Sequence, residues 1–432
     1  MIDKTVYVGL AADILHKGHL NILKLASKYG KVTVGLLTDE AIATYKQIPL
    51  LTYNEREAVI KNIRFVDKVI PQKTLDYTSN LKRLKPNFVV HGDDWKEGPQ
   101  KEVRKKVIKI LKLWSGKLVE PRYTSGISSS EIKKKISSSI SVIDGRRSRL
   151  KRLILSKKIV RIIESHSPLT GKIIEETFIN KNNIRQEFDG MWSSSLTDSS
   201  FKGKPDNQSV DYSSRLEMLN DILDVTTKPI VFDADNGGRI EHIPYLVKSL
   251  DRMGVSAMII EDKVGLKKNS LFKDQSNVNQ DTITNFKKKI SVSKKARFSE
   301  DFMIIARIES FILEKGLKDA LKRAEEYSKA GADAILIHSK DKSIHNLIQF
   351  AKKFSKSKYY KPLVCVPSAY SHIREKQLSK IGFKIVIYAN HMLRTSYKSM
   401  KEVAFDILRN ERSFDAKNNQ ITTVKEIISL IK

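Results

Sequence analysis

The chain has 432 residues, of which 40% are hydrophobic and 30% charged, so it is long enough for two or three domains with real cores. This composition excludes collagen-like and mainly disordered proteins, and no apolar run approaches the roughly 20 residues of a membrane-spanning helix. A single cysteine, Cys365, excludes a disulfide scaffold and a cysteine-built zinc site. The net charge of +30 comes mostly from scattered lysines, which is more typical of a compositional bias than of nucleic-acid binding. The start, MIDKTVYVGL, predicts a strand and not a signal peptide, so we expect a cytoplasmic protein without membrane attachment.

The first part of the chain alternates strand and helix patterns. Helical patterns, for example over residues 19–29 and 55–64, separate five short apolar segments. Such alternation predicts an α/β domain with an open, doubly wound parallel sheet of the Rossmann-like type. We place this domain at residues 1–136, and its predicted strands at residues 5–9, 32–37, 66–71, 87–91 and 117–121.

A segment rich in serine and basic residues follows, and we predict a linker at residues 137–148. Its Arg146 and Arg147, with the adjoining Arg149, are interpreted as solvated, with phosphate contact as the alternative. Residues 149–432 then show eight further strand patterns, which favours a (β/α)8 barrel followed by a short amphipathic helix at 422–432. The predicted barrel strands are residues 171–177, 190–194, 229–235, 257–262, 303–309, 334–339, 362–367 and 385–390.

Two histidines, His16 and His19, follow the first predicted strand, with Gly18 between them. The glycine lets a ligand approach the backbone at a helix N-terminus, where free N–H groups and the helix dipole favour phosphate. The imidazoles can donate hydrogen bonds to the phosphates of a nucleotide. Two more loops at strand ends, residues 91–95 and 123–130, complete the layout of a nucleotide crevice.

Together, the motifs HxGH, GDDW and TSGISSS make residues 6–135 resemble the cytidylyltransferase branch of the HxGH nucleotidyltransferases. The resemblance implies transfer of CMP from CTP, with Mg²⁺, to a phosphate or phosphonate. It also implies that His16 and His19 contact the CTP phosphates, and that Lys46 and Arg56 neutralise triphosphate charge. Tyr123 stands where glycerol-3-phosphate enzymes carry arginine, which puts glycerol phosphate in doubt as the acceptor. The other implied nucleotide-binding residues are Gly9, Asp13, Gly18, Gly92, Asp93, Asp94, Trp95, Thr124, Ser125, Gly126, Ile127, Ser128 and Ser129.

In the second half, charged or titratable residues collect where predicted strands end. Asp233 and Asp235 end one strand, where a period of two places them on the same face. The ends of the next three strands carry Glu261, then Arg307 with Glu309, and His338. Carboxylates from several strand ends suit Mg²⁺, and Arg307 with His338 suits a small dianion or a carboxylate. Loop capping is the alternative for any single aspartate.

The loop of residues 261–270 is similar to the EDKxxxKxNS motif of the phosphoenolpyruvate mutases in the isocitrate lyase superfamily. Residues 192–196, 204–206, 232–238, 306–309 and 389–391 support this resemblance, which covers about residues 150–432. Lyases of the superfamily carry a catalytic cysteine in this loop, whereas here Cys365 lies in an apolar strand and is predicted to be core. Phosphonopyruvate hydrolases share the loop but tend to lack the asparagine equivalent to Asn269, so Asn269 favours the mutase.

The resemblance assigns roles to single residues. Asp233 would hold Mg²⁺ with Asp235 and Glu261, mostly through water. Arg307 and the backbone of Ser194 and Leu196 would fix pyruvate, and the loop 264–272 would close to exclude water. The migrating phosphoryl group would be surrounded by Asp206, Lys267, Asn269 and His338. Asp206 would either bond covalently to phosphorus or only orient the group. The remaining predicted substrate contacts are Trp192, Ser195, Asp235 and Ser270. Ser195 stands where the family has glycine.

The sequence therefore predicts one chain with two enzymes of phosphonate biosynthesis. The barrel would isomerise phosphoenolpyruvate, and the first domain would couple CMP to hydroxyethylphosphonate or aminoethylphosphonate. By analogy with the superfamily, we expect a homo-oligomer, a dimer or tetramer that exchanges a helix near the C-terminus. Two alternatives stay open: a phosphonopyruvate hydrolase barrel, or a basic nucleic-acid-binding or scaffolding protein with inactive sites.

Overall fold

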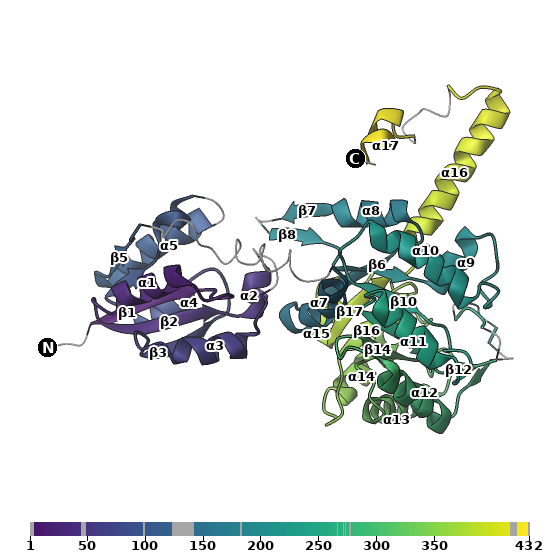
Figure 1. Cartoon of the computed structure of the whole chain (residues 1–432), viewed down its shortest axis with the longest axis horizontal. Coiled ribbons are helices and arrows are strands. Elements are labelled where there is room, and N and C mark those ends of the chain that lie inside the picture. The colour runs from purple at the N-terminus through teal and green to yellow at the C-terminus, as the bar shows by residue number, and fades with distance from the viewer. Residues whose placement is uncertain are drawn as a thin grey trace. The chain divides into compact units, whose positions relative to one another are not determined.

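The computed structural model describes residues 4–44, 49–97, 100–122, 142–181, 184–265, 267–270, 272, 274–275, 278–414 and 421–430. The chain folds as two compact units, which divide near residue 142, and residues 155–158 and 179–186 group with the first unit as well (Figure 1). Each unit is described by itself below. The predicted nucleotide contacts Lys46 and Thr124–Ser129, and the first part of the predicted linker, lie outside the described residues.

The first unit is built on a five-stranded parallel sheet, as predicted. Alternate side chains of the central strand β1 enter two separate cores, with Val6 and Val8 on one face of the sheet and Tyr7 on the other. Both faces of this strand are therefore buried, which fits its apolar sequence. The strand order is β3-β2-β1-β4-β5, so the direction of winding reverses between β1 and β4. The crevice outside such a reversal is where open α/β sheets bind ligands. The strands are β1 (Thr5–Leu10), β2 (Lys31–Leu37), β3 (Lys68–Gln72), β4 (Phe88–Val90) and β5 (Lys117–Val119).

Helices cover both faces of this sheet (Figure 1). Good caps begin several of them: Thr38 caps α2, and Thr52 forms a capping box with Glu55 at the start of α3. The helices are α1 (Lys17–Ala26), α2 (Asp39–Ala43), α3 (Tyr53–Lys61), α4 (Thr78–Leu84) and α5 (Lys101–Leu111), with 3₁₀ turns η1 (Asp93–Lys96) and η3 (Lys112–Trp114).

The second unit is a closed parallel barrel of eight strands, which confirms the predicted (β/α)8 fold. Its strands are buried almost throughout, as expected for a parallel sheet covered by helices. In order around the barrel they are β10 (Ile230–Asp233), β11 (Ala257–Glu261), β14 (Met303–Ile308), β15 (Ala334–Ile337), β16 (Leu363–Cys365), β17 (Phe383–Tyr388), β6 (Val160–Glu164) and β9 (Gly190–Ser193). Buried Cys365 lies in β16, as predicted.

Helices follow the strands, and there are two short hairpins, of which the one formed by β7 and β8 groups mostly with the first unit. The hairpins are β7 (Phe178–Lys181) with β8 (Ile184–Glu187), and β12 (Lys263–Val264) with β13 (Asn279–Gln280). The helices are α7 (Val142–Ser156), α8 (Pro168–Glu176), α9 (Ser195–Phe201), α10 (Tyr212–Asp224), α11 (Ile243–Arg252), α12 (Ile283–Ala296), α13 (Gly316–Lys329), α14 (His345–Phe354), α15 (Glu375–Ile381), α16 (His391–Asn410) and α17 (Val424–Leu430).

The predicted strand at residues 171–177 is wrong. Most of this segment belongs to α8, and the first barrel strand is β6, which the sequence pattern did not reveal. The physical reason is a strong helix start, because Ser167 caps the helix and Pro168 occupies its first turn. Six of the other seven predicted barrel strands contain an observed one, and the seventh, at 385–390, overlaps β17.

The predicted linker also needs a correction, because residues 142–148 begin helix α7. The Arg146 side chain is buried and donates hydrogen bonds of 2.9 Å to the carbonyl oxygens of Leu223 and Thr226. Arg147 forms an ion pair of 2.6 Å with buried Asp251. These two arginines therefore fasten α7 to the barrel unit and are not solvated linker residues.

Helix α16 is the longest in the barrel unit and runs away from the barrel (Figure 1). None of its residues is buried, and its apolar side chains Tyr397, Met400, Phe405 and Leu408 are exposed. None of the helices in the described part of the chain is long and apolar enough to cross a membrane.

Candidate active sites

The carboxyl ends of the barrel strands surround one pocket. Ten residues predicted from the sequence line it together: Ser194, Ser195, Leu196, Asp206, Asp233, Lys267, Asn269, Ser270, Arg307 and His338. Asn390 and Ala389, from the end of β17, also line it. Trp192 is buried within β9 and is absent from this lining.

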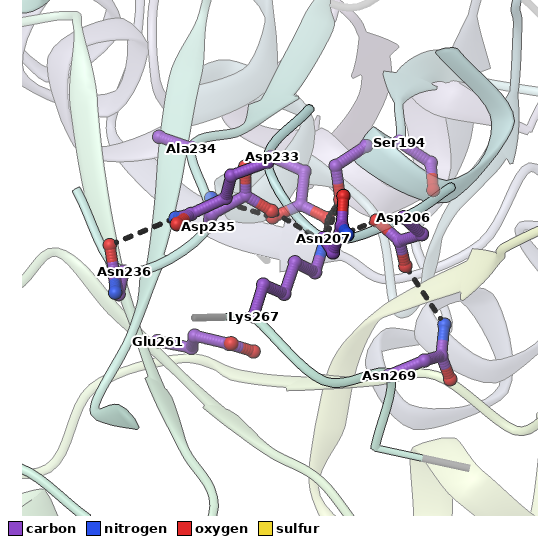
Figure 2. A network of polar contacts seen from close by, with 12 residues as sticks. Ser194, Asp206, Asn207, Asp233, Ala234, Asp235, Asn236, Glu261, Lys267 and Asn269 are labelled. Carbon is purple, nitrogen blue, oxygen red and sulfur yellow. Dashed lines mark hydrogen bonds and ion pairs between the residues drawn. The ribbon is translucent and has the colours of Figure 1, made fainter. Parts of the chain in front are cut away.

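An ammonium group lies among three carboxylates on one side of the pocket. The Lys267 Nζ atom is 3.1 Å from Asp206 Oδ1 and 4.0 Å from Asp233 Oδ2, and it pairs closely with Asp235 Oδ1. Figure 2 shows the lysine side chain reaching between these aspartates. It also donates to the Ser195 hydroxyl, which in turn donates to Asp233 Oδ2 over 3.1 Å.

Lys267 and Asp233 each hold the pKa of the other on the side that keeps it charged. Burial acts to lower the pKa of Lys267, but Asp235, Asp233 and Asp206 together hold it above its ordinary value. Burial acts to raise the pKa of Asp233, but Lys267, Arg307 and Arg215 hold it below its ordinary value. The lysine is therefore an ammonium and Asp233 a carboxylate at neutral pH.

Asp235 reaches this group by a route that the period-two pattern does not describe. Strand β10 ends at Asp233, and Asp235 follows it with a left-handed φ of 50°. Its backbone N–H donates to Asp233 Oδ1 over 3.2 Å, which ties the two residues together. A left-handed aspartate is uncommon, and such strained residues cluster at functional sites.

A second cluster is centred on Arg307. Its guanidinium donates to Glu309 Oε1 over 2.5 Å and to the Ser270 hydroxyl over 2.9 Å, and it lies 3.3 Å from Glu261. It also lies 2.9 Å from His338 Nδ1. Burial, with the charge of Arg307, lowers the pKa of His338, so the imidazole is neutral at pH 7. The same Nδ1 atom lies 3.1 Å from Glu309 Oε1, so the imidazole stands between the guanidinium and a carboxylate.

The loop that follows β12 is fastened to the strand ends at two points. The Lys263 ammonium donates to the Lys268 carbonyl oxygen over 2.9 Å and to the Ser270 hydroxyl over 2.8 Å. Ser270 donates to Glu309 over 2.6 Å, and Asn269 donates to Asp206 over 3.1 Å. Residues 267–270 are therefore held against the pocket by buried, charged hydrogen bonds.

The donor atoms of this pocket fit a magnesium ion. Asp206 Oδ1 and Asp235 Oδ1 are buried, and within the described residues their only partner is the Lys267 ammonium. Within the same residues, no group of three or more His, Cys, Asp or Glu side chains is arranged to hold a metal directly. Mg²⁺ is usually bound by few protein ligands, all of them oxygen atoms, and water completes its coordination shell.

In the first unit, the two histidines of the HxGH motif lie together at the start of α1. His16 caps the helix by accepting a hydrogen bond from the Gly18 N–H over 3.2 Å, and His19 Nδ1 accepts from the His16 N–H over 3.4 Å. Their ring centroids are 3.9 Å apart. Since both Nδ1 atoms accept, each neutral ring keeps its proton on Nε2 as a donor.

Asp13 and Arg56 have partners inside the protein. Asp13 is buried and accepts from the Leu50 N–H over 2.5 Å. The buried Arg56 guanidinium donates to the carbonyl oxygens of Ala11 and Leu37 and pairs with Asp39 over 2.5 Å. Arg56 thus joins the loops that follow β1 and β2, which differs from the expected direct contact with triphosphate.

Gly9 and Trp95 also have structural tasks. A Cβ atom on Gly9 would lie 2.2 Å from the Tyr77 hydroxyl, so only glycine leaves room for that ring. The Trp95 indole is buried, stacks on His91 at 3.9 Å and donates to Glu120 over 2.7 Å. It anchors the loop that carries Gly92, Asp93 and Asp94, where the side chain of Asp94 is about half exposed.

Comparisons with known proteins match both units of the chain to families. Residues 150–408 match the family model of phosphoenolpyruvate phosphomutase, and residues 7–135 match a cytidylyltransferase-like model. The chain belongs to the phosphoenolpyruvate phosphomutase family.

Individual relatives cover the barrel of this mutase-family chain. A phosphoenolpyruvate phosphomutase of Tetrahymena pyriformis is 36% identical over 282 residues, which are 65% of this chain and 89% of the relative. The solved phosphoenolpyruvate phosphomutase of Streptomyces platensis subsp. rosaceus has a TM-score of 0.60 at 31% identity, over 66% of this chain and 94% of its own. A solved phosphonopyruvate hydrolase in complex with oxalate and Mg²⁺ has a TM-score of 0.58 at 30% identity, over 68% and 95%.

Ala389 and Asn390 support the family resemblance but were not predicted as pocket residues. Two more pocket residues of this mutase-family barrel were not predicted either, Val366 and Ser368. Both follow β16, whose apolar VCVP sequence gives no chemical signal. Their place after a barrel strand was the one available indication.

Proposed function

We propose that the barrel isomerises phosphoenolpyruvate to 3-phosphonopyruvate. The observation that carries this proposal is the loop at residues 267–270, which covers the pocket with Asn269 fastened to Asp206. The loop has no cysteine, unlike that of the related lyases, and it has the asparagine that favours a mutase over a hydrolase. The relatives that carry the name phosphoenolpyruvate phosphomutase support the same assignment.

The reaction breaks the bond between phosphorus and the enol oxygen and forms one between phosphorus and C3 of the same molecule. Arg307 would bind the carboxylate, with the backbone at Ser194 and Leu196. Asn269 and the His338 imidazole would stabilise the phosphoryl oxygens, and Asp206 would face the phosphorus. When bound by Asp233, Asp235 and Glu261, Mg²⁺ would neutralise negative charge on the pyruvate oxygens.

Exclusion of water is the main requirement of this mechanism. A phosphoryl group that leaves through a loose, metaphosphate-like state reacts with any nearby water. The ties of residues 267–270 to Lys263 and Glu309 serve this purpose, because they close the pocket during transfer. A hydrolase with the same fold would instead admit one water.

Phosphorus NMR separates these two functions. Phosphonopyruvate and Mg²⁺ are added to the purified chain, and the products are followed. A mutase converts phosphonopyruvate to phosphoenolpyruvate without release of phosphate. Release of phosphate with no phosphoenolpyruvate would show a hydrolase and refute our proposal.

We further propose that the first unit transfers CMP from CTP to a phosphonate, such as 2-hydroxyethylphosphonate or 2-aminoethylphosphonate. The support is the pair of Nε2–H donors at the N-terminus of α1, beside the sheet's switch point. The phosphonate oxygen would attack the α-phosphorus of CTP and pyrophosphate would leave. Phosphorus NMR with CTP, Mg²⁺ and each phosphonate would show a new diphosphate-type pair for the true acceptor, and no pair with either would reject both.

The protein is also proposed to be a cytoplasmic homo-oligomer that acts on small molecules and not on nucleic acid. A second copy of the chain is the expected partner of α16, because its exposed apolar residues extend along the helix and have no cover within the described part of this copy. Light scattering of the purified protein tests this directly.

A further inference from the structure

Lys267 stands in the position that the proposed chemistry assigns to a divalent cation. Its ammonium contacts Asp206 and Asp235 and lies 4.0 Å from Asp233. Two of these residues, Asp233 and Asp235, are the proposed magnesium ligands. The ammonium occupies the space between these carboxylates that a divalent ion bound to Asp233 and Asp235 would also use.

Repulsion strengthens this conflict. A unit positive charge and a divalent cation a few ångströms apart in a buried site repel strongly. Among the described residues, the other hydrogen-bond partner of the ammonium is the Ser195 hydroxyl, a neutral group. Arg215 also lies 3.5 Å from Asp235 Oδ2, but Arg215 and Arg307 pair more closely with other carboxylates, those of Asp198 and Glu309.

We propose that Lys267 and the divalent cation compete for the same carboxylates, so that cation binding moves Lys267 off the aspartates toward the substrate. This inference rests on the proposed mutase function, since that function supplies the cation. The lysine thus acts as an internal counter-ion before the metal binds. Afterwards it is available to the transferring phosphoryl group.

The loop is built to allow such a movement. Asn236, next to Asp235, donates to the Gly265 carbonyl oxygen over 3.2 Å and accepts from Gln208 over 3.2 Å. The residues around the aspartates therefore touch the loop just before Lys267. Gly265 has a φ of 83°, in the left-handed region that favours glycine, and open space on its Cβ side, so no side chain at this position hinders a change in the path of the loop.

The rest of the loop can stay in place while Lys267 moves. Lys263 and Ser270 are bound to Glu309 and to each other, and neither contacts Asp233 or Asp235 in the hydrogen bonds and ion pairs of the described residues. The movement we propose is therefore local to one side chain and its neighbours, with the pocket still covered at Ser270.

Mn²⁺ binding, followed by electron paramagnetic resonance, tests the competition without any turnover. Lys267→Met removes the charge at similar length and should tighten Mn²⁺ binding at least tenfold, which corresponds to about 1.4 kcal/mol. Lys268→Met is the matched control. The Lys268 ammonium pairs with the exposed carboxylate of Asp274 over 2.8 Å and not with the aspartates of the pocket. Equal or weaker Mn²⁺ binding by Lys267→Met would overturn the proposal.

A second experiment uses the unchanged protein, in case Lys267→Met does not fold. Acylation of lysines by an amine-reactive reagent is measured by mass spectrometry with and without Mg²⁺. Mg²⁺ should increase the labelling of Lys267 relative to Lys263, whose side chain is equally buried at 4% exposure against 6%. An unchanged ratio would also overturn the proposal. A chain that shows the competition but no mutase turnover would instead refute the proposed function alone.

Discussion

Ser270 joins the pocket loop to the barrel, and its replacement by alanine gives a sharp test of loop closure. The hydroxyl donates to Glu309 over 2.6 Å and accepts from Lys263 over 2.8 Å and from Arg307 over 2.9 Å. All three partners are charged and buried. Ser270→Ala removes the three contacts and leaves room for water where the hydroxyl was.

The magnitude follows from these contacts. A hydrogen bond to a charged group contributes about 1.5–3 kcal/mol, and three that share one hydroxyl do not add up fully. We therefore assign about 1.5–3 kcal/mol in total to the closed loop, which shifts the ratio of closed to open forms by about 10- to 150-fold. A phosphoryl group that leaves in the open form meets water, so part of the turnover should become hydrolysis.

Phosphorus NMR measures both outcomes in one tube. Starting from phosphonopyruvate, Ser270→Ala should form phosphoenolpyruvate at least tenfold more slowly than wild type and release free phosphate. Ser256→Ala is the matched control, because it removes another buried hydroxyl, one that donates to the Arg146 carbonyl oxygen over 2.7 Å. A Ser270→Ala enzyme with an unchanged rate and no phosphate release would refute the assigned role of the loop contacts.

Three further predictions test the two sites, the electrostatics and the assembly. Asp233→Ala should abolish mutase turnover and leave CMP transfer intact, whereas His16→Ala should do the reverse; phosphorus NMR of both reactions decides, and loss of both by one change contradicts separate sites. Burial raises the pKa of Asp262 to about 6, so its ionisation costs stability as the pH rises through that value. Urea titration gives the free energy of unfolding of the wild type and of Asp262→Asn. The wild-type value minus the variant value should be larger at about pH 4 than at about pH 8, by up to about 3 kcal/mol. A difference that does not change with pH would contradict this prediction. Leu408→Glu, on the exposed face of α16, should lower the mass measured by light scattering, and an unchanged oligomer would exclude this face from the interface.

Most of the fold could be predicted because each unit repeats a simple pattern. Apolar runs between amphipathic helices predict parallel sheets, and seven of the eight barrel strands were placed this way. The failure came at the first βα unit, where the predicted strand at 171–177 has two adjacent isoleucines soon after a glycine and resembles a strand in composition. The serine and proline that cap α8 were the better signal, and they outweigh composition because they settle where backbone N–H groups are satisfied.

The barrel pocket could be predicted residue by residue because carboxyl ends of parallel strands meet at one edge. What could not be predicted is how its charges pair. The spacing of Lys267 within the loop says nothing of which carboxylates it meets, since that depends on the left-handed turn at Asp235 and on the path of the loop back across the pocket. Lys263 has the same chemistry four residues earlier, yet it is directed to Ser270 and Glu309.

Arg56 shows the same limit in the first unit. A basic residue near a phosphate site is equally compatible with a ligand contact and with a structural role, and only the fold separates these. Here the guanidinium has carbonyl partners from two loops and one carboxylate, which is the arrangement of a buried arginine that fixes backbone. The guanidinium lies at the carboxyl ends of β1 and β2. Its effect on a triphosphate would therefore act through the position of the loops that follow these two strands. Arg56→Lys should therefore weaken stability as well as CMP transfer, because a single ammonium cannot reach all of these acceptors.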